Sequence, residues 1–158
     1  MKDFLLLFVI FTSLGWCGVA GAEANSMAVT VPVFTRHFPH SSSDLNEHNR
    51  GFGLEYALGK DVNLTAGVFN NSLRKDTTYV GVQYTPYRVF GLHTGVIVGL
   101  DLSGGYDSIN PIKPIIGAVH FATGKEYPIG FNIDILPGGW NRNGLYGAAA
   151  AVSMKYSF

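Results

Sequence analysis

Residues 144–158, GLYGAAAAVSMKYSF, alternate between two kinds of side chain. From Tyr146 onward every second residue is apolar, and the residues between them are small or polar. A repeat of two over such a length predicts a β-strand with one apolar face. The stretch exceeds the ~5–6 residues usual in soluble strands and suits a tilted strand crossing a bilayer, for which ~9–11 suffice. The alternative is the last strand of a soluble barrel.

The rest of the chain favours the membrane alternative. The sequence ends on Phe158 with Tyr156 two positions earlier, an ending that resembles the C-terminal signal of bacterial outer-membrane β-barrels. Hydrophobic residues make up 47% of the chain, charged residues only 14%, and 20 residues are glycine. Beyond the N-terminal segment, no apolar run reaches the ~18 residues that a transmembrane helix needs. A strongly apolar, glycine-rich chain without such helices favours a barrel in lipid.

The N-terminal segment, residues 1–22, is predicted to be a secretory signal peptide. Lys2 precedes a short apolar run at residues 4–14, and residues 20–22 form a small-residue cleavage site. The run is too short to span a bilayer. Cys17 would suit a lipoprotein, but the bulky Trp16 directly before it argues against lipoprotein processing. Residues 23–158 are then expected to form one barrel domain that contains no disulfide.

Period-two alternation predicts eight strands in this domain, and longer polar loops alternate with short turns between them. The strands are residues 28–38, 51–58, 62–69, 77–85, 91–100, 112–122, 127–135 and 145–158. The predicted fold class is all-β, an eight-stranded antiparallel transmembrane β-barrel of the outer-membrane type. The loops after the first, third, fifth and seventh strands should face outside the cell, and the short turns the periplasm. Closure of the barrel leaves no edge strand.

The same alternation assigns polar residues to the barrel interior and aromatic residues to the membrane interfaces. The lumen should hold a polar network, made of Glu55, His93, His120, Asp134 and Lys155. The aromatic belt should include Phe90, Tyr127, Trp140 and Tyr156. The 11 basic and 11 acidic residues balance, so no basic patch for nucleic acid is expected. Metal-ligand spacings, phosphate loops and nucleotide motifs do not occur, and we expect neither a metal nor a cofactor.

The polar groups of greatest chemical interest fall at one end of the predicted barrel. His37 ends the first strand, and Asn71 and Ser72 directly follow the third, so all three belong to the external rim. At these residues the chain resembles the lipid A palmitoyltransferase (PagP) family of eight-stranded outer-membrane barrels. The resemblance extends from about residue 31 to residue 158. It is carried by VPVFTRH at 31–37, Asn46-Glu47, GFGL at 51–54, Asn71-Ser72, the strand at 91–98, ILPG at 135–138 and Asn143-Gly144.

The resemblance implies a catalytic His, Asp and Ser that move a fatty acyl chain from a glycerophospholipid to lipid A. His37 and Ser72 fall on the family's histidine and serine. Asn71 stands where the family has aspartate, so it can position His37 by a hydrogen bond but cannot supply a carboxylate charge. The chemistry is consistent, because acyl transfer needs a base to activate a hydroxyl and a donor for the oxyanion.

Three further residues take a predicted role from the same resemblance. Pro32 and Pro137 would weaken hydrogen bonding near the rim and open lateral routes for lipid. Gln83 stands where the family has a glycine at the floor of its acyl-chain pocket, and would shorten or close that pocket. The implied partners are a phospholipid acyl donor, a lipid A acceptor and the bacterial outer membrane. We expect the protein to be a monomer.

Simpler interpretations stay open for these residues. His37 could be an ordinary surface histidine, and Asn71-Ser72 a plain turn dipeptide. A second hypothesis is therefore a non-enzymatic barrel that serves as an envelope scaffold, a surface-exclusion factor or a receptor. An apolar lumen open from the rim would favour the enzyme. A lumen plugged by Glu55, Gln83, His93 and Lys155 would favour the non-enzymatic barrel.

Overall fold

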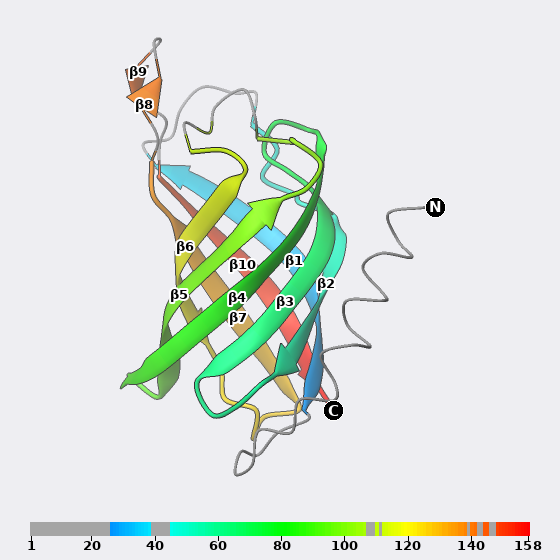
Figure 1. The fold of residues 1–158 in the computed structure, drawn as a ribbon, viewed down its shortest axis with the longest axis vertical. Helices are drawn as coiled ribbons and strands as arrows, with labels where there is room; N and C mark the ends of the chain where they lie inside the picture. The colour runs from blue at the N-terminus through cyan, green and yellow to red at the C-terminus, as the bar shows by residue number, and fades with distance from the viewer. Residues whose placement is uncertain are drawn as a thin grey trace.

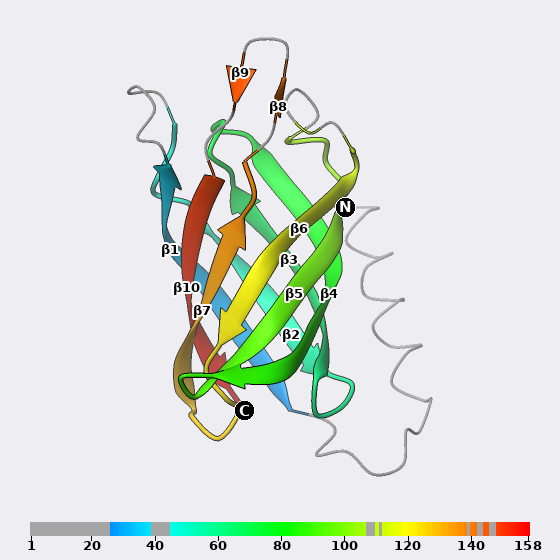
Figure 2. The same cartoon turned by 90° about the vertical axis from the view of Figure 1, so that its left-hand side faces the viewer.

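The chain folds into a closed barrel of antiparallel strands (Figures 1 and 2). The computed structural model describes residues 26–38, 45–106, 110, 112–138, 140–141, 144–145 and 148–158. The predicted signal peptide lies outside these residues. The barrel strands are β1 (Met27–Phe38), β2 (Gly51–Ala57), β3 (Val62–Asn70), β4 (Asp76–Val89), β5 (Leu92–Asp101), β6 (Ile115–Ala122), β7 (Ile129–Leu136) and β10 (Ala148–Ser157). A small hairpin, β8 (Trp140–Asn141) with β9 (Gly144–Leu145), stands beyond the barrel end (Figure 1).

Closure joins the two ends of the described chain. β1 pairs with β2 on one side and with β10 on the other. The backbones of Met27 and Phe158 exchange two hydrogen bonds, of 3.0 and 2.9 Å. The predicted eight-stranded antiparallel barrel is thereby confirmed. We call the end at which β1, β3, β5 and β7 terminate the loop rim, and the opposite end, which holds Phe158 and the short turns, the turn rim. In the described part of the chain, no helix is long and apolar enough to cross a membrane.

The distribution of apolar side chains is the reverse of that in a soluble protein. Large apolar residues point outward, for example Phe52, Val98 and Met154, each about half exposed. Within the described chain, the buried hydrophobic residues are all alanines. Such an outer surface is suited to lipid, in which it would be buried. Of the predicted aromatic belt, Phe90, Tyr127 and Tyr156 are exposed near the turn rim, while the side chain of Trp140 lies outside the described part.

The lumen is filled by polar side chains that bond to one another. The Oε1 atom of Glu55 accepts hydrogen bonds from Gln83 Nε2 at 2.8 Å and from Asn132 Nδ2 at 2.6 Å. Elsewhere in the lumen, His120 Nδ1 lies 2.6 Å from Asp134 Oδ1, and Lys155 Nζ donates to the carbonyl of Thr123 at 2.8 Å. The predicted polar lumen is therefore confirmed, although His93 is only partly buried.

Most strand boundaries lie within two residues of the predicted ones, and those of β4, β6 and β10 differ by more. β4 continues past residue 85 through Pro86, because a register shift between Tyr84 and Tyr87 leaves the proline outside the regular pairing. The turn then falls at Phe90-Gly91, both of which have positive φ. β6 begins at Ile115 and not at residue 112, and β10 begins at Ala148 and not at residue 145.

Candidate functional site

A bulge in β1 decides which of its side chains face the lumen. Before the bulge the inward residues have even numbers, such as Thr30, and after it they have odd numbers, such as Thr35 and His37. The pairing of β1 with β10 shifts register between Pro32 and Phe34. One extra residue reverses the alternation of a strand, because its side-chain period is two. The bulge beside Pro32 therefore turns His37 inward, to 9% exposure.

Ser72 lies in the turn between β3 and β4, and the side chain of Asn71 holds that turn. The Oδ1 atom of Asn71 accepts the backbone N–H of Leu73 at 2.8 Å and of Lys75 at 3.0 Å. Its Nδ2 atom donates to Thr77 Oγ1 at 3.0 Å. Asn71 is completely buried, and Ser72 is 8% exposed. The amide of Asn71 thus stabilises the turn that presents Ser72.

Asn71 does not position His37 by the hydrogen bond that the resemblance allowed, because its side chain bonds to Leu73, Lys75 and Thr77. Within the described residues, His37 bonds through Nε2 to Ser72, and its Nδ1 atom has no hydrogen-bond partner. The physical reason is local: a buried turn leaves its backbone donors without water, and the amide oxygen of Asn71 satisfies two of them.

The loop after β1 returns across the rim and carries a carboxylate to the histidine. The backbone N–H of Thr35 donates to the carbonyl of Glu47 at 2.9 Å, and that of Asn46 donates to the carbonyl of Ser72 at 2.9 Å. The side chain of Asn46 also bonds to the backbone of Asn71, and that of Asn49 to the backbone of Asn70. The segment at residues 46–49 therefore connects β1 to the turn that holds Ser72.

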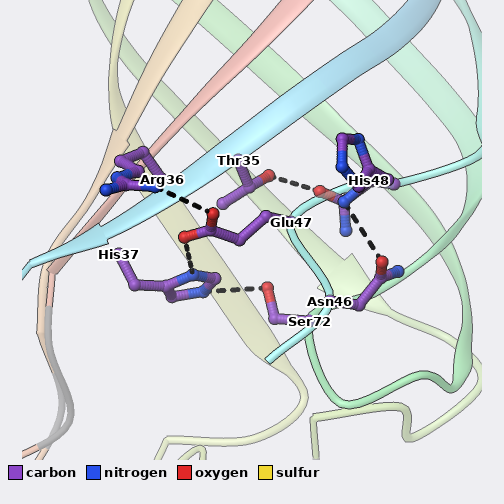
Figure 3. A network of polar contacts seen from close by, with 8 residues as sticks. Thr35, Arg36, His37, Asn46, Glu47, His48 and Ser72 are labelled. Atoms are coloured by element: carbon purple, nitrogen blue, oxygen red, sulfur yellow. Dashed lines mark hydrogen bonds and ion pairs between the residues drawn. The ribbon is translucent and has the colours of Figure 1, made fainter. Parts of the chain in front are cut away.

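These elements bring a serine, a histidine and a glutamate together, as Figure 3 shows. The Nε2 atom of His37 lies 3.0 Å from Ser72 Oγ. The Nδ1 atom of His37 lies 3.8 Å from Oε1 of Glu47, whose other oxygen is 3.1 Å from Arg36. The glutamate thus faces the free nitrogen of the imidazole. This is the order of groups with which a base activates a hydroxyl and a carboxylate orients the base.

Glu47 is the residue of this site that the sequence analysis missed as a functional group. It was noted there only as part of the Asn46-Glu47 pair. It is 29% exposed and belongs to an irregular loop, where no periodic pattern tells which way a side chain points. One feature of the sequence could have identified Glu47: it is a carboxylate close in sequence to His37, in the loop that follows the same strand. Side chains that could jointly hold a metal ion do not cluster in the described part of the chain.

The remaining predicted site residues lie apart from this group. Pro32 lies at the bulge of β1, and Pro137 is exposed directly after β7. Gln83 is buried in the lumen, where Glu55 accepts its amide N–H and Asn63 donates to its oxygen. Its neighbours are therefore polar, whereas the lining of an acyl-chain pocket has to be apolar.

The fold defines the class of this protein: it is a transmembrane β-barrel in architecture, with an apolar outside and a polar inside. Among solved structures the chain is similar to one titled "De novo design of transmembrane beta-barrels", with a TM-score of 0.51 and 19% sequence identity. The match covers 85% of this chain and 96% of the designed one. No model of a known protein family matches the sequence, and no curated protein matches it.

Proposed function

We propose that this protein is a serine-dependent acyl-ester enzyme of the bacterial outer membrane, with its site at the loop rim. The contact of His37 with Ser72, with Glu47 facing the other imidazole nitrogen, is the observation that carries the proposal. Ser72 is the nucleophile, His37 the general base and Glu47 the group that orients the base. The groups stand in the order of a Ser-His-acid triad, which recurs on unrelated folds. Glu47 lies 3.8 Å from His37 Nδ1 and acts on the imidazole through its charge, not through a hydrogen bond.

The reaction divides into two balanced halves. Ser72 Oγ attacks the carbonyl carbon of the acyl ester while its proton passes to His37 Nε2, and the carbonyl electron pair moves to the oxygen. Collapse of this intermediate breaks the bond to the leaving alcohol, which takes the proton from His37. A second hydroxyl then attacks the acyl-serine and loses its proton to His37. The acyl–oxygen bond to Ser72 breaks, and His37 returns the proton to Ser72 Oγ. Water as the second nucleophile gives a free fatty acid, and a lipid hydroxyl gives a new ester.

The position of the site supports a membrane lipid as the substrate. Exposed apolar side chains of the barrel, Phe34, Phe38 and Phe52, lie on the two strands next to the site. An acyl chain could lie against this outer surface with its ester at the rim. The predicted transfer from a glycerophospholipid to lipid A is one form of this reaction. Its acceptor would be a sugar hydroxyl of lipid A in the outer leaflet.

The filled lumen argues against the internal acyl-chain pocket that the family resemblance implies. Glu55, Gln83 and Asn132 bond to one another across the barrel, where an internal acyl chain would need an apolar slot. A cavity beside Glu55 and Lys155, close to the turn rim, has a volume of about 20 Å³, enough for one water molecule. The same observation favours the second candidate function, a non-enzymatic barrel that serves as an envelope scaffold, a surface-exclusion factor or a receptor.

The test combines an activity assay with lipid analysis. The parent protein, folded in detergent micelles, is given p-nitrophenyl palmitate, and lipids from cells with and without the protein are compared by mass spectrometry. We expect ester cleavage by the parent and none by Ser72→Ala or His37→Ala. Ser157→Ala and His93→Ala, which alter the same residue types at the turn rim, should leave cleavage unchanged.

The lipid spectra separate the forms of the reaction. A palmitoyl-sized mass gain on lipid A would support transfer, and loss of an acyl chain from a membrane lipid would support hydrolysis. No cleavage by the parent and identical lipid spectra would leave the non-enzymatic barrel as the function.

A further inference from the structure

The carboxylate of Glu47 lies between two nitrogen groups of β1. Its Oε2 atom accepts a hydrogen bond from Arg36 Nη1 at 3.1 Å, and its Oε1 atom faces His37 Nδ1 at 3.8 Å (Figure 3). The second distance is too long for a hydrogen bond. Of these two neighbours, Glu47 therefore bonds to Arg36 and only faces the histidine.

The nitrogen of His37 that faces Glu47 is buried and lacks a hydrogen bond. His37 is 9% exposed, and within the described residues its Nδ1 atom has no hydrogen-bond partner. A buried polar atom without a partner is unfavourable. A movement of Glu47 toward the imidazole would therefore be favourable once Arg36 engaged another anion.

Arg36 is placed where such an anion can reach it. After the bulge, the even-numbered residues of β1 face outward, and Arg36 lies between the exposed Phe34 and Phe38 on that face. The side chain of Arg36 is 51% exposed. Its partner in β10 is Ala150, whose methyl group is too short to cover a guanidinium. A cation at this end of an apolar outer surface lies at the level of the lipid headgroups.

We propose that Arg36 is a specificity-determining residue: it binds the phosphate beside the ester that Ser72 attacks, and this contact releases Glu47 to His37. The inference rests on the proposed function. A guanidinium binds a phosphate through two parallel hydrogen bonds, which a lone carboxylate oxygen does not match. A glycerophospholipid carries its phosphate and one ester on neighbouring glycerol carbons, so an ester at Ser72 brings the phosphate to the same rim.

The bound phosphate acts on Glu47 in two ways. It competes for the N–H groups of Arg36, and its negative charge repels the carboxylate. Glu47 can then accept a hydrogen bond from Nδ1–H of His37, and this bond strengthens as the imidazole takes the proton of Ser72. No covalent bond changes in this rearrangement. A neutral ester, in contrast, leaves Glu47 bonded to Arg36.

The test compares two lipids that differ in the phosphate headgroup. Fatty acid release from dipalmitoylphosphatidylglycerol and from dipalmitoylglycerol is measured in micelles of the same neutral detergent. For the parent we expect a kcat roughly 10–100-fold higher with phosphatidylglycerol, as for one charge-assisted hydrogen bond, and a lower KM. Inorganic phosphate added to dipalmitoylglycerol separates the two sources of phosphate. It should not restore the rate, because it is not held beside the ester.

Two variants separate phosphate binding from the release of Glu47. Arg36→Gln should reduce the kcat difference between the lipids to within about twofold, and should cleave dipalmitoylglycerol faster than the parent because Glu47 is released. Glu47→Gln should lose the kcat difference but keep the lower KM for phosphatidylglycerol, since Arg36 still binds phosphate. Arg88→Gln, which alters an exposed arginine of β4 near the turn rim, is the matched control and should retain the kcat difference of the parent.

The outcomes distinguish this inference from the proposed function. Ser72-dependent cleavage of both lipids with equal kcat, or a kcat difference that Arg36→Gln retains, would overturn the role of Arg36 alone. A kcat difference that persists in Glu47→Gln would overturn the release of Glu47. Full acceleration by inorganic phosphate would overturn the lipid headgroup as the ligand. Absence of Ser72-dependent cleavage of either lipid and of p-nitrophenyl palmitate would overturn the proposed function and this inference together.

Discussion

His37 and Ser72 belong to segments that do not pair with each other, yet Nε2 and Oγ lie 3.0 Å apart. β2 lies between their strands in the barrel order. The contact forms at the loop rim, beyond the first residue of β2. There the segment that precedes β2 bonds both to β1 and to the turn between β3 and β4. The site therefore depends on that loop as much as on the strands.

Glu47→Gln should lower Ser72-dependent ester cleavage. The variant keeps the size of the side chain but loses the charge that faces His37 Nδ1 and stabilises the imidazolium formed during the reaction. Because Glu47 is partly exposed and shared with Arg36, we expect a loss of roughly 10–100-fold in kcat, equivalent to about 1.4–2.8 kcal/mol of barrier. The same assay on Glu126→Gln, a carboxylate at the turn rim, provides the control. A parent-like kcat in Glu47→Gln would exclude Glu47 from the mechanism.

Asn71→Asp should not raise the rate, although the family resemblance suggested that it would. The side chain is fully buried, points into its own turn and donates to Thr77. A carboxylate there loses the amide donor and is buried, at a cost of about 1–3 kcal/mol in folding free energy. Steady-state kinetics of the purified variant check this. A faster Asn71→Asp enzyme would mean that the turn rearranges and presents residue 71 to His37.

Glu55→Leu should destabilise the barrel more than Glu55→Gln does. Leucine would leave the amides of Gln83 and Asn132 without their shared acceptor, each at a cost of roughly 1–3 kcal/mol. Glutamine retains an oxygen that can accept one or both bonds. The measurement is urea unfolding in micelles, followed by the heat-sensitive gel mobility of the compact barrel. Equal urea midpoints for the two variants would argue against the network as a source of stability.

Alkaline pH should destabilise the parent more than Tyr106→Phe. Tyr106 lies in the loop between β5 and β6, and burial of its phenol raises the folded-state pKa of Tyr106 to about 12 from an ordinary 10.0. Its contribution to stability is therefore complete below pH 10. It is lost as the pH rises from 10 through about 12, because the unfolded state releases the phenol proton first. Urea midpoints measured at pH 9 and pH 11 should therefore fall less in the variant. Equal decreases would mean that Tyr106 is exposed to solvent.

The strands could be predicted because period-two alternation is a local property of the sequence. The boundary errors fall where that pattern is interrupted: at the bulge around Pro86, and before Ile115, where residues 112–114 form a turn. His37 and Ser72 could be assigned to one rim from topology alone. The distance of 3.0 Å between His37 Nε2 and Ser72 Oγ confirms that the two residues share this rim.

The role of Glu47 could not be predicted in the same way. Its side chain comes from an irregular loop, and its direction depends on backbone bonds between segments distant in sequence. The backbone bonds of Asn46 and Thr35 set that direction. The periodic pattern of apolar residues does not predict such contacts.

The bulge of β1 limits how this gene can change in length. Val33 has no partner in β10, because Pro32 pairs with Ser153 and Phe34 with Val152. Deletion of Val33 would therefore make the strand regular and keep His37 facing the lumen. Insertion of one residue between Phe34 and His37 would instead exchange the faces of the strand end, placing Arg36 inside and His37 toward lipid. Homologous proteins that keep the histidine could thus lack the bulge residue, whereas a single-codon insertion after Phe34 should abolish the contact with Ser72 while leaving β2 to β7 intact.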